Sequence, residues 1–382
     1  MSLIPLSAAP AGATNGPMPK LPDTLRGYVD KYFLRSRHIL AAEGLDPVVT
    51  MQVFFRDGPG VLAGVDEAVA LLREASDLAA HGGSLYALPE GAAYTPLEPV
   101  MHITGRLQDF IELETLYLGI ISAATSLAAG LPEPRPEDVE QKAAAVRALL
   151  PEKNLMYFGA RHWHPRCEEA FCRAAVAGGF DACATDAGAR AAGLPAGVGT
   201  IPHALVLAFA GQVGRERATC AAAAAFDRHI EASCPRVALV DTFNHEVDDA
   251  LATAKALGQK LAAVRLDTAG ELIGQGGEPF DGRPYWTGTG VTVAGTLAVR
   301  RALDAAGFAH VGIVLSSGFG NLEKIKAFVQ AENEYGRLFE SLGIGGLFRS
   351  YAATADIVRL GGADLAKTGR AYRENPRLVR FI

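Results

Sequence analysis

Apolar positions in the first third of the chain follow both strand-like and helix-like spacing. Residues 48–55 form a β-rich run that ends at an Arg-Asp-Gly turn signal. Residues 66–80 have the spacing of a helix, while 84–88 and 100–103 are short strand-like pieces. Residues 107–129 are long and mostly apolar, which predicts a further helix. This mixture predicts an α/β arrangement for the first part of the chain.

A proline-rich segment at 131–136 separates this part from a more regular one. Strand-like and helical stretches then alternate: strands are predicted at 237–241, 261–266 and 311–315, helices at 246–257, 291–306 and from 321 onward, and a glycine-rich insertion at 270–290. Such a β-α-β-α alternation predicts a parallel sheet. Polar residues directly follow each strand, and in a (β/α) barrel that edge carries the active site.

The composition narrows the class of protein. A chain of 382 residues is long enough for a barrel domain and a smaller companion, and its net charge of -6 argues against nucleic-acid or anionic-membrane partners. Five cysteines without a Cys-x-x-Cys pair predict free thiols in a reducing compartment. No apolar run has the length of a membrane span, and residues 1–22 resemble a flexible tail more than a signal peptide. We therefore expect a cytoplasmic protein.

Two glycine-rich segments are candidates for a phosphate site. Residues 316–320 (SSGFG) follow a predicted strand and precede a helix, and residues 342–346 (LGIGG) come later. Backbone N–H groups at such turns, with a helix dipole behind them, bind phosphate. Either segment alone is more simply a tight turn, whereas the two in this order, late in a predicted barrel, favour a phosphate site.

The strand at 261–266 ends with a cation and an anion. Arg265 and Asp267 are two positions apart, so their side chains share a face of the strand. A guanidinium suits a carboxylate, carboxamide or phosphate, and a carboxylate suits ribose hydroxyls or a metal-bound pyrophosphate. A structural ion pair is an equally good interpretation of the pattern alone.

Three further segments carry polar or aromatic groups whose pattern is weak on its own. Phe158 and Arg161 lie in FGARHWHP, where a ring and a guanidinium could hold a flat ligand. His203 ends GTIPH before an apolar helix, and a lone histidine is more often structural. Asp241 ends a strand, and Thr242 or Asn244 after it is a candidate helix cap.

Taken in order, FGAR, GTIPH, VDTF, VRLDT and SSGFG resemble the nicotinate phosphoribosyltransferase family, most closely its short archaeal-type branch. The resemblance extends from VDKYFLRS, near residue 29, to AKTGR at 366–370, and it is specific only as a combination. It implies a type II phosphoribosyltransferase fold: α/β, with an irregular (β/α) barrel beside an N-terminal α/β domain that the C-terminal segment completes. The expected boundaries are a flexible tail at 1–22, the N-terminal domain at 23–130, the barrel at 131–347 and the returning segment at 348–382.

The resemblance also implies roles for single residues. Tyr32 corresponds to a tyrosine that reaches the site of a second subunit, and Phe158 to the ring that stacks on the pyridine. His203 corresponds to the histidine that is transiently phosphorylated in relatives coupled to ATP. The expected residues are, for catalysis, His203, Asp267 and Arg265; for the base, Tyr32, Phe158, Arg265 and Asp186; and for the phosphoribosyl group, Arg161, Thr200, Asp241, Ser317, Gly318, Gly343, Gly345 and Gly346.

The implied reaction joins nicotinate to 5-phosphoribosyl 1-pyrophosphate, giving nicotinate mononucleotide and pyrophosphate in NAD biosynthesis. The protein must align the reactants and stabilise the charge that leaves with pyrophosphate. Mg²⁺ is the expected cofactor, with Asp267 and Asp241 as indirect ligands, and ATP is a candidate co-substrate. The expected assembly is a homodimer or a dimer-based oligomer.

The sequence departs from the family's pattern at three places. His162 stands where a second arginine is usual, AGE at 269–271 replaces a Pro/Ser-rich turn, and GIGG at 343–346 lacks the threonine of GVGT.

Two alternative functions stay open. Asp186 lies close to where nicotinamide-using relatives carry an aspartate, although a helix cap is its more ordinary interpretation. The first alternative is therefore a nicotinamide phosphoribosyltransferase. The second is a catalytically silent regulator that binds phosphoribosyl ligands.

Overall fold

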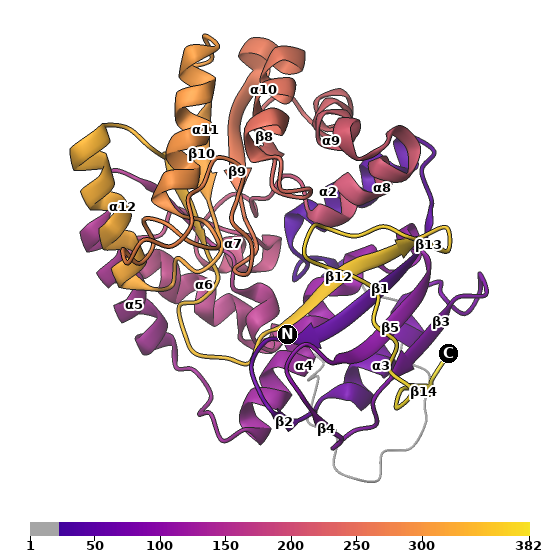
Figure 1. The fold of residues 1–382 in the computed structure, drawn as a ribbon. Helices are drawn as coiled ribbons and strands as arrows, with labels where there is room; N and C mark the ends of the chain where they lie inside the picture. Colours follow the sequence, from indigo (N-terminus) through magenta and orange to yellow (C-terminus); the bar gives the residue numbers. More distant parts are fainter. Residues whose placement is uncertain (1–22) are drawn as a thin grey trace.

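A computed structural model describes residues 23–382, and the expected tail at 1–22 lies outside the described residues. The described chain contains a parallel and an antiparallel sheet, each of six strands, and a small two-stranded pair. Figure 1 shows the antiparallel sheet on one side of the molecule and the parallel sheet, with α10, α11, α12, α5 and α6 around it, on the other.

The strands are β1 (Val48–Phe55), β2 (Gly60–Val61), β3 (Ser84–Ala87), β4 (Ala93–Tyr94), β5 (Pro99–Arg106), β6 (Asn154–Tyr157), β7 (Ala182–Cys183), β8 (Arg236–Leu239), β9 (Leu261–Leu266), β10 (Gly312–Leu315), β11 (Ser341–Ile344), β12 (Ala353–Leu360), β13 (Ala363–Asp364) and β14 (Val379–Arg380). The α-helices are α1 (Asp23–Arg26), α2 (Lys31–Ala42), α3 (Val65–Ala75), α4 (Glu114–Ala128), α5 (Pro136–Leu149), α6 (Glu168–Ala177), α7 (Asp186–Ala191), α8 (His203–Val213), α9 (Arg215–His229), α10 (Glu246–Leu257), α11 (Val293–Ala305) and α12 (Leu322–Tyr335). Short 3-10 helices are η1 (Leu107–Asp109), η2 (Ile111–Leu113), η3 (Ala160–His162), η4 (Pro165–Cys167) and η5 (Gly258–Lys260).

The parallel sheet has the strand order β7-β6-β11-β10-β9-β8. Strands β8 to β11 follow one another along the chain, and β11 then pairs with β6, so early and late segments share one sheet. Five of the six residues of β9 and all four of β10 are buried, as expected for a sheet covered on both faces. The predicted parallel sheet is confirmed, and among residues 23–382 its edges β7 and β8 are not hydrogen-bonded to each other.

The antiparallel sheet joins both ends of the described chain. Its order is β13-β12-β1-β5-β3-β14, so strands from the C-terminal segment flank strands from the first part. β12 runs antiparallel to β1, with Ala355 opposite Val53, and β14 pairs with β3. Between β13 and β14 the chain passes the parallel sheet, where Lys367 donates a hydrogen bond to Asp241.

Three predicted elements were wrong in their bounds. The helix predicted at 66–80 ends at Ala75, because Ser76 takes an extended backbone (φ -109°, ψ 163°). The helix predicted at 107–129 is interrupted, because Phe110 leaves the helical region (φ -144°) between η1 and η2. The glycine-rich segment at 342–346 is in large part strand, since β11 includes Gly343. In these three places strand pairing and tertiary packing, rather than the local sequence pattern, determine the secondary structure.

The longest apolar helical stretch is part of the core. The prediction that no apolar run has the length of a membrane span was wrong, because by length and composition alone Ile111–Ala128 could cross a membrane, yet 78% of it is buried inside the protein. This is the burial of a core helix. Glu114 begins α4 inside that core with only 7% of its side chain exposed, 4.0 Å from a guanidinium nitrogen of Arg161. Burial raises the pKa of Glu114 to about 8, and Arg161 offsets only part of that rise.

Because the pKa of Glu114 is raised, we expect the stability of the protein to depend on pH, and we expect Glu114→Gln to abolish this dependence. Between about pH 5 and pH 8 the folded protein holds a proton on Glu114 that the unfolded chain has lost, so stability falls as the pH rises through this range. The glutamine variant should therefore unfold at a higher temperature than the wild type at pH 8.5 and at a similar temperature near pH 5. Thermal unfolding across this range measures it. A variant that is destabilised equally at every pH would contradict the prediction.

Candidate active site

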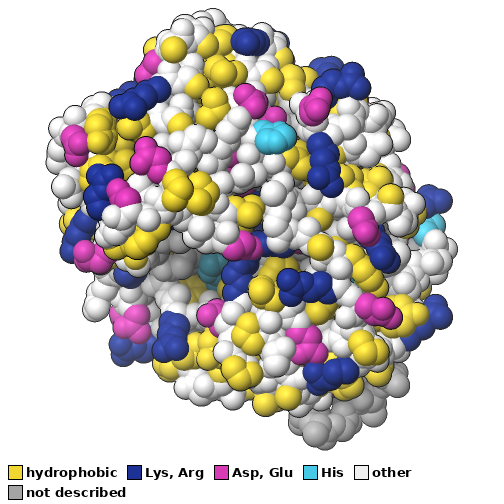
Figure 2. Space-filling view, viewed as in Figure 1, with side chains coloured by type: hydrophobic (Ala, Val, Ile, Leu, Met, Phe, Trp, Pro, Cys, Tyr) yellow, Lys and Arg dark blue, Asp and Glu magenta, His cyan; other side chains and the backbone are white. Residues whose placement is uncertain are grey.

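The carboxyl edge of the parallel sheet gathers groups from distant parts of the sequence. Because the strands are parallel, all their carboxyl ends lie at the same edge. Each strand is followed there by a candidate residue or by its neighbour: Asp186 after β7, Phe158 and Arg161 after β6, Gly345 and Gly346 after β11, Ser317 and Gly318 after β10, Asp267 after β9 and Asp241 after β8. Figure 2 shows a hollow between the two sheets, in which a histidine and Lys or Arg side chains gather.

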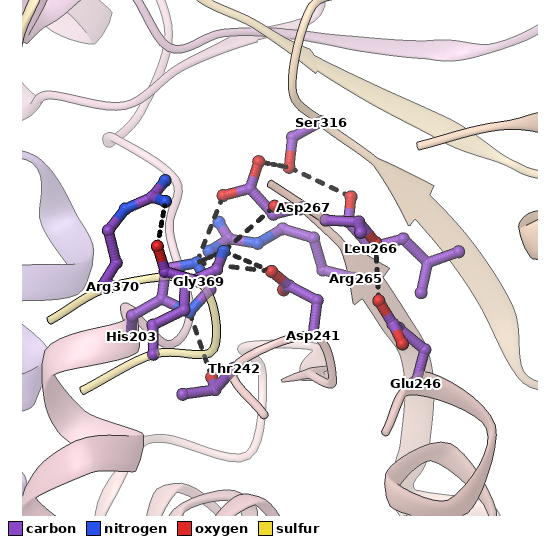
Figure 3. A network of polar contacts seen from close by, with 12 residues as sticks. His203, Asp241, Thr242, Glu246, Arg265, Leu266, Asp267, Ser316, Gly369 and Arg370 are labelled. Carbon is purple, nitrogen blue, oxygen red and sulfur yellow. Dashed lines mark hydrogen bonds and ion pairs between the residues drawn. The ribbon is translucent and has the colours of Figure 1, made fainter. Parts of the chain in front are cut away.

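His203 lies at the centre of a polar network at this edge (Figure 3). It is the first residue of α8. Its Nε2 is 2.9 Å from Nζ of Lys367, and its Nδ1 is 3.0 Å from Oγ1 of Thr242. The donor and acceptor roles of the two ring nitrogens depend on the tautomer, and the contacts hold the ring in one orientation between Lys367 and Thr242.

Lys367 makes three contacts in this network and was missing from the predicted site. Its ammonium group is 2.5 Å from Oδ2 of Asp241, and it also donates to the backbone oxygen of Asp267 at 3.2 Å. Both side chains of the ion pair are buried, at 6% and 0% exposure. The only sequence signal was its place in AKTGR, because a single lysine in a loop has no periodicity that would assign it to a site.

Asp267 is held as a carboxylate. Its Oδ1 accepts a hydrogen bond from Ser316 at 2.9 Å, and its Oδ2 lies 3.6 Å from Nε2 of His203. Burial acts to raise its pKa, but His203, Arg265 and Lys367 together outweigh burial and hold the pKa well below the usual range. Asp267 is therefore ionised at neutral pH, with part of its side chain still exposed to a ligand.

Arg265 is a buried cation without a carboxylate partner. Its side chain donates from Nη2 to the backbone oxygen of Ile201 at 3.1 Å, and its buried Nε has no hydrogen-bond partner. Among residues 23–382 no carboxylate oxygen lies within 4.0 Å of its guanidinium, although the charge of Arg265 still acts on Asp267 from a greater distance. A buried charge is costly to leave uncompensated, which favours an anionic ligand at this position.

Tyr32, Arg161 and Phe158 lie together in the same chain. The hydroxyl of Tyr32 is 3.5 Å from Nη1 of Arg161. The ring of Phe158 packs on Gly343, where an added Cβ would lie 2.1 Å from the ring. The resemblance had implied that this tyrosine serves a second subunit, whereas here it reaches Arg161 of its own chain. Gly343 lies within β11 beneath Phe158, so its absent side chain makes room for an aromatic ring.

The two glycine segments meet at the edge of the sheet. An added Cβ on Gly320 would lie 2.2 Å from the backbone oxygen of Gly346. None of the backbone N–H groups of residues 317–320, nor those of Gly345 and Gly346, donates to a partner among the described residues. Unpaired donors of this kind suit a phosphate. The phosphate-loop interpretation thus gains a geometric basis for Ser317, Gly318, Gly345 and Gly346, while Gly343 belongs to the strand.

Asp186 has a different local role from the one expected. Thr185 caps α7, because its Oγ1 accepts from the N–H of Gly188 at 3.2 Å. Asp186 instead accepts from Lys31 at 2.7 Å and from the N–H of Gly197 at 2.9 Å. Burial acts against ionisation, but these hydrogen bonds lower the pKa of Asp186. Lys31 compensates its charge, so Asp186 repels a carboxylate ligand less than an unpaired aspartate would.

His162 lies beside the second glycine segment, and Thr200 precedes His203 in the chain. An added Cβ on Gly345 would lie 2.6 Å from the His162 ring, so this imidazole packs against the second glycine segment. Burial and the nearby Arg161 lower the pKa of His162 to about 4, so the ring is neutral where relatives are expected to carry a second arginine. Thr200 is half-buried in the segment leading to His203.

A magnesium ion finds only part of the expected ligand set. Among residues 23–382, no group of three or more His, Cys, Asp or Glu side chains is arranged to hold a metal. Asp267 is partly exposed and ionised, which suits a carboxylate contact to a magnesium–pyrophosphate complex. Oδ2 of Asp241 is bound to Lys367, while its buried Oδ1 has no hydrogen-bond partner among the described residues.

The buried ion pair predicts a strong effect of Lys367→Met. Removing the ammonium group leaves Asp241 buried and unpaired, which should lower the free energy of unfolding by about 3–5 kcal/mol. Adding Asp241→Asn removes the orphaned charge and should restore at least half of the loss. Urea unfolding of the single and double variants measures it, with the exposed Lys255→Met as control. Equal stability of Lys367→Met and wild type would contradict the ion pair.

Comparisons with known proteins show that the chain is similar to phosphoribosyltransferases. The family model of the quinolinate phosphoribosyl transferase N-terminal domain matches residues 30–125. A nicotinate phosphoribosyltransferase of Mycobacterium tuberculosis is 33% identical over 218 residues, which cover 56% of this chain and 45% of that protein. The chain thus spans about half the length of the curated relatives it matches.

Solved structures extend the likeness. The nicotinate-nucleotide pyrophosphorylase of Pyrococcus furiosus is 32% identical, with 91% of this chain and 79% of that chain covered and a TM-score of 0.45. A putative nicotinate phosphoribosyltransferase of Saccharomyces cerevisiae shares the fold, with a TM-score of 0.66, 15% identity and coverage of 93% of this chain and 94% of that chain. Together with the motifs at the carboxyl edge of the sheet, these matches mean that the chain belongs to the nicotinate phosphoribosyltransferase family.

Proposed function

We propose that this protein joins nicotinate to 5-phosphoribosyl 1-pyrophosphate, producing nicotinate mononucleotide and pyrophosphate. The observation that carries the proposal is Arg265, a buried guanidinium without a carboxylate partner at the edge where unpaired backbone donors also converge. A planar guanidinium suits a carboxylate, as nicotinate carries, and the backbone donors suit the 5-phosphate. Lys31 compensates Asp186, which is consistent with a negatively charged base.

The reaction requires alignment more than covalent chemistry from the protein. The pyridine nitrogen forms a bond to the anomeric carbon while the bond from that carbon to the pyrophosphate oxygen breaks and the electron pair leaves with pyrophosphate. Phe158 would support the flat base, and the glycine segments would hold the 5-phosphate. Asp267, ionised beside Arg265, would orient the ribose and stabilise positive charge at the anomeric carbon.

Magnesium and ATP are further parts of the proposal. Bound Mg²⁺ would neutralise charge on the departing pyrophosphate, and Asp267 is the residue that would contact it. ATP coupling would act through His203, whose two ring nitrogens are hydrogen-bonded to Thr242 and Lys367. Phosphorylation of this ring therefore requires one of those hydrogen bonds to break.

The architecture and assembly are proposed on the same basis. We infer that the parallel strands form the wall of an irregular (β/α) barrel at 131–347, that 23–130 is the companion domain, and that 348–382 completes it. The pairing of β12 with β1 supports the last point. The enzyme would act as a cytoplasmic homodimer or an assembly of dimers.

Pyrophosphate release tests the function. Purified protein with 5-phosphoribosyl 1-pyrophosphate and Mg²⁺ should release pyrophosphate with nicotinate, measured by a coupled assay with and without ATP. Release with nicotinamide but not with nicotinate would mean that nicotinamide is the substrate base. Release with neither base, despite binding of ribose 5-phosphate, would favour a silent regulator and sink the proposal.

Arg265→Ala should lower kcat/KM for nicotinate by about 10²–10³-fold, because a charge-assisted bidentate contact is lost and the buried partner group is left unpaired. Arg301→Ala, a change at an exposed arginine of α11, is the matched control and should leave kcat/KM unchanged. Steady-state kinetics with each substrate varied in turn measures both. Full activity of Arg265→Ala would remove this residue from the site.

A further inference from the structure

A second buried lysine lies beneath the first glycine segment. Lys324 is in the first turn of α12, yet only 7% of the residue is exposed. Its ammonium group donates to the backbone oxygen of Ser317 at 2.9 Å and lies 4.4 Å from the centre of the Phe319 ring. An added Cβ on Gly318 would lie 3.6 Å from the same nitrogen. The side chain therefore turns back from the helix and supports the segment from below.

The segment needs such support because of its backbone. Ser317 has φ +70° and Gly318 has φ +78°. Glycine adopts this left-handed region freely, but a serine there is strained relative to its preferred conformations. The carbonyl that accepts the hydrogen bond from Lys324 belongs to this strained residue. The same backbone conformation leaves the N–H groups of residues 317–320 without partners among the described residues.

The charge of Lys324 also suits an anion above the segment. Burial lowers the pKa of its ammonium group to about 8, while the carboxylate of Asp267 acts in the opposite direction. A buried cation gains most from a nearby anion when little water lies between them. Its position next to Gly318 places this charge on the side of the segment opposite to solvent.

We propose that Lys324 is a positioning residue of the 5-phosphate subsite: by holding the carbonyl of Ser317, it fixes the backbone that presents the N–H groups of residues 317–320 to the phosphate. The assignment rests on the proposed function, in which this segment holds the 5-phosphate of 5-phosphoribosyl 1-pyrophosphate. Nothing in the sequence pattern singled out Lys324, because one lysine in a helix is most often solvated.

Lys324→Met tests the assignment by a split between KM and kcat. The loss of a hydrogen bond from a charged donor should raise KM for 5-phosphoribosyl 1-pyrophosphate by about 10- to 150-fold. The value of kcat and the KM for nicotinate should change less than about threefold, since Lys324 contacts neither the base nor the reacting carbon. Lys326→Met is the matched control, because Lys326 is exposed on the same helix and pairs with Glu323. An unchanged KM, or an equal loss with both substrates, would overturn the proposal.

Binding of ribose 5-phosphate, measured by calorimetry, separates this proposal from the proposed function. Wild type should bind this probe and Lys324→Met should bind it at least tenfold more weakly, about 1.4 kcal/mol, whether or not nicotinate is turned over. Wild type that binds the probe without turnover would sink the proposed function alone. Wild type that does not bind it would overturn the role of Lys324 as well.

A change at Ser317 tests the mechanism itself. Because glycine adopts positive φ without strain, Lys324→Met should weaken ribose 5-phosphate binding at least threefold less in a Ser317→Gly background than in wild type. An equal loss in both backgrounds would contradict the support of Ser317 by Lys324. Lys324→Gln, too short to reach the carbonyl, should give the same losses and replaces the methionine variant if that variant does not fold.

Discussion

The buried ion pair between Lys367 and Asp241 is the interaction on which the site depends. It connects the C-terminal segment, which is held in the antiparallel sheet by β12, to the carboxyl end of β8 in the parallel sheet. The same ammonium group lies 2.9 Å from Nε2 of His203 and donates a hydrogen bond to the backbone oxygen of Asp267. A buried carboxylate without a partner would be strongly destabilising, so the ion pair with Lys367 stabilises the buried Asp241. Because the two residues belong to different parts of the chain, the pair also holds the C-terminal segment against the parallel sheet.

The rest of the site consists of polar groups that the fold leaves without partners. The guanidinium of Arg265 and the N–H groups of residues 317–320, Gly345 and Gly346 are costly to hold in this state. The buried strands β9, β10 and β11, which contain or precede these groups, supply stability that offsets this cost. Lys324 shows how the strain is carried locally, since one buried side chain supports a serine in the left-handed region.

The secondary structure was predictable from the sequence where the local pattern and the tertiary environment agree. The strand at Leu261–Leu266 and the helix at Glu246–Leu257 have the predicted bounds, because a buried parallel strand and an amphipathic helix have clear periods. The prediction of a turn at Gly343 was wrong, because this glycine is explained by packing under the Phe158 ring. Neither Lys367 nor Lys324 was predicted from the sequence. Lys367 contacts Asp241, which is far away in the chain, and Lys324 contacts the backbone of Ser317 in the preceding loop.

The sequence by itself determined the alternation of strands and helices, the polar residues that follow each strand, and hence the edge at which a site would form, because these depend on local periodicity and on the direction of parallel strands. Only the tertiary structure decided which charges are paired. Asp186 is paired with Lys31 and Asp241 with Lys367, whereas Arg265 forms no direct ion pair with a carboxylate of the described chain. Pairing depends on distances of a few ångströms between segments that are far apart in sequence, and no local pattern records such distances.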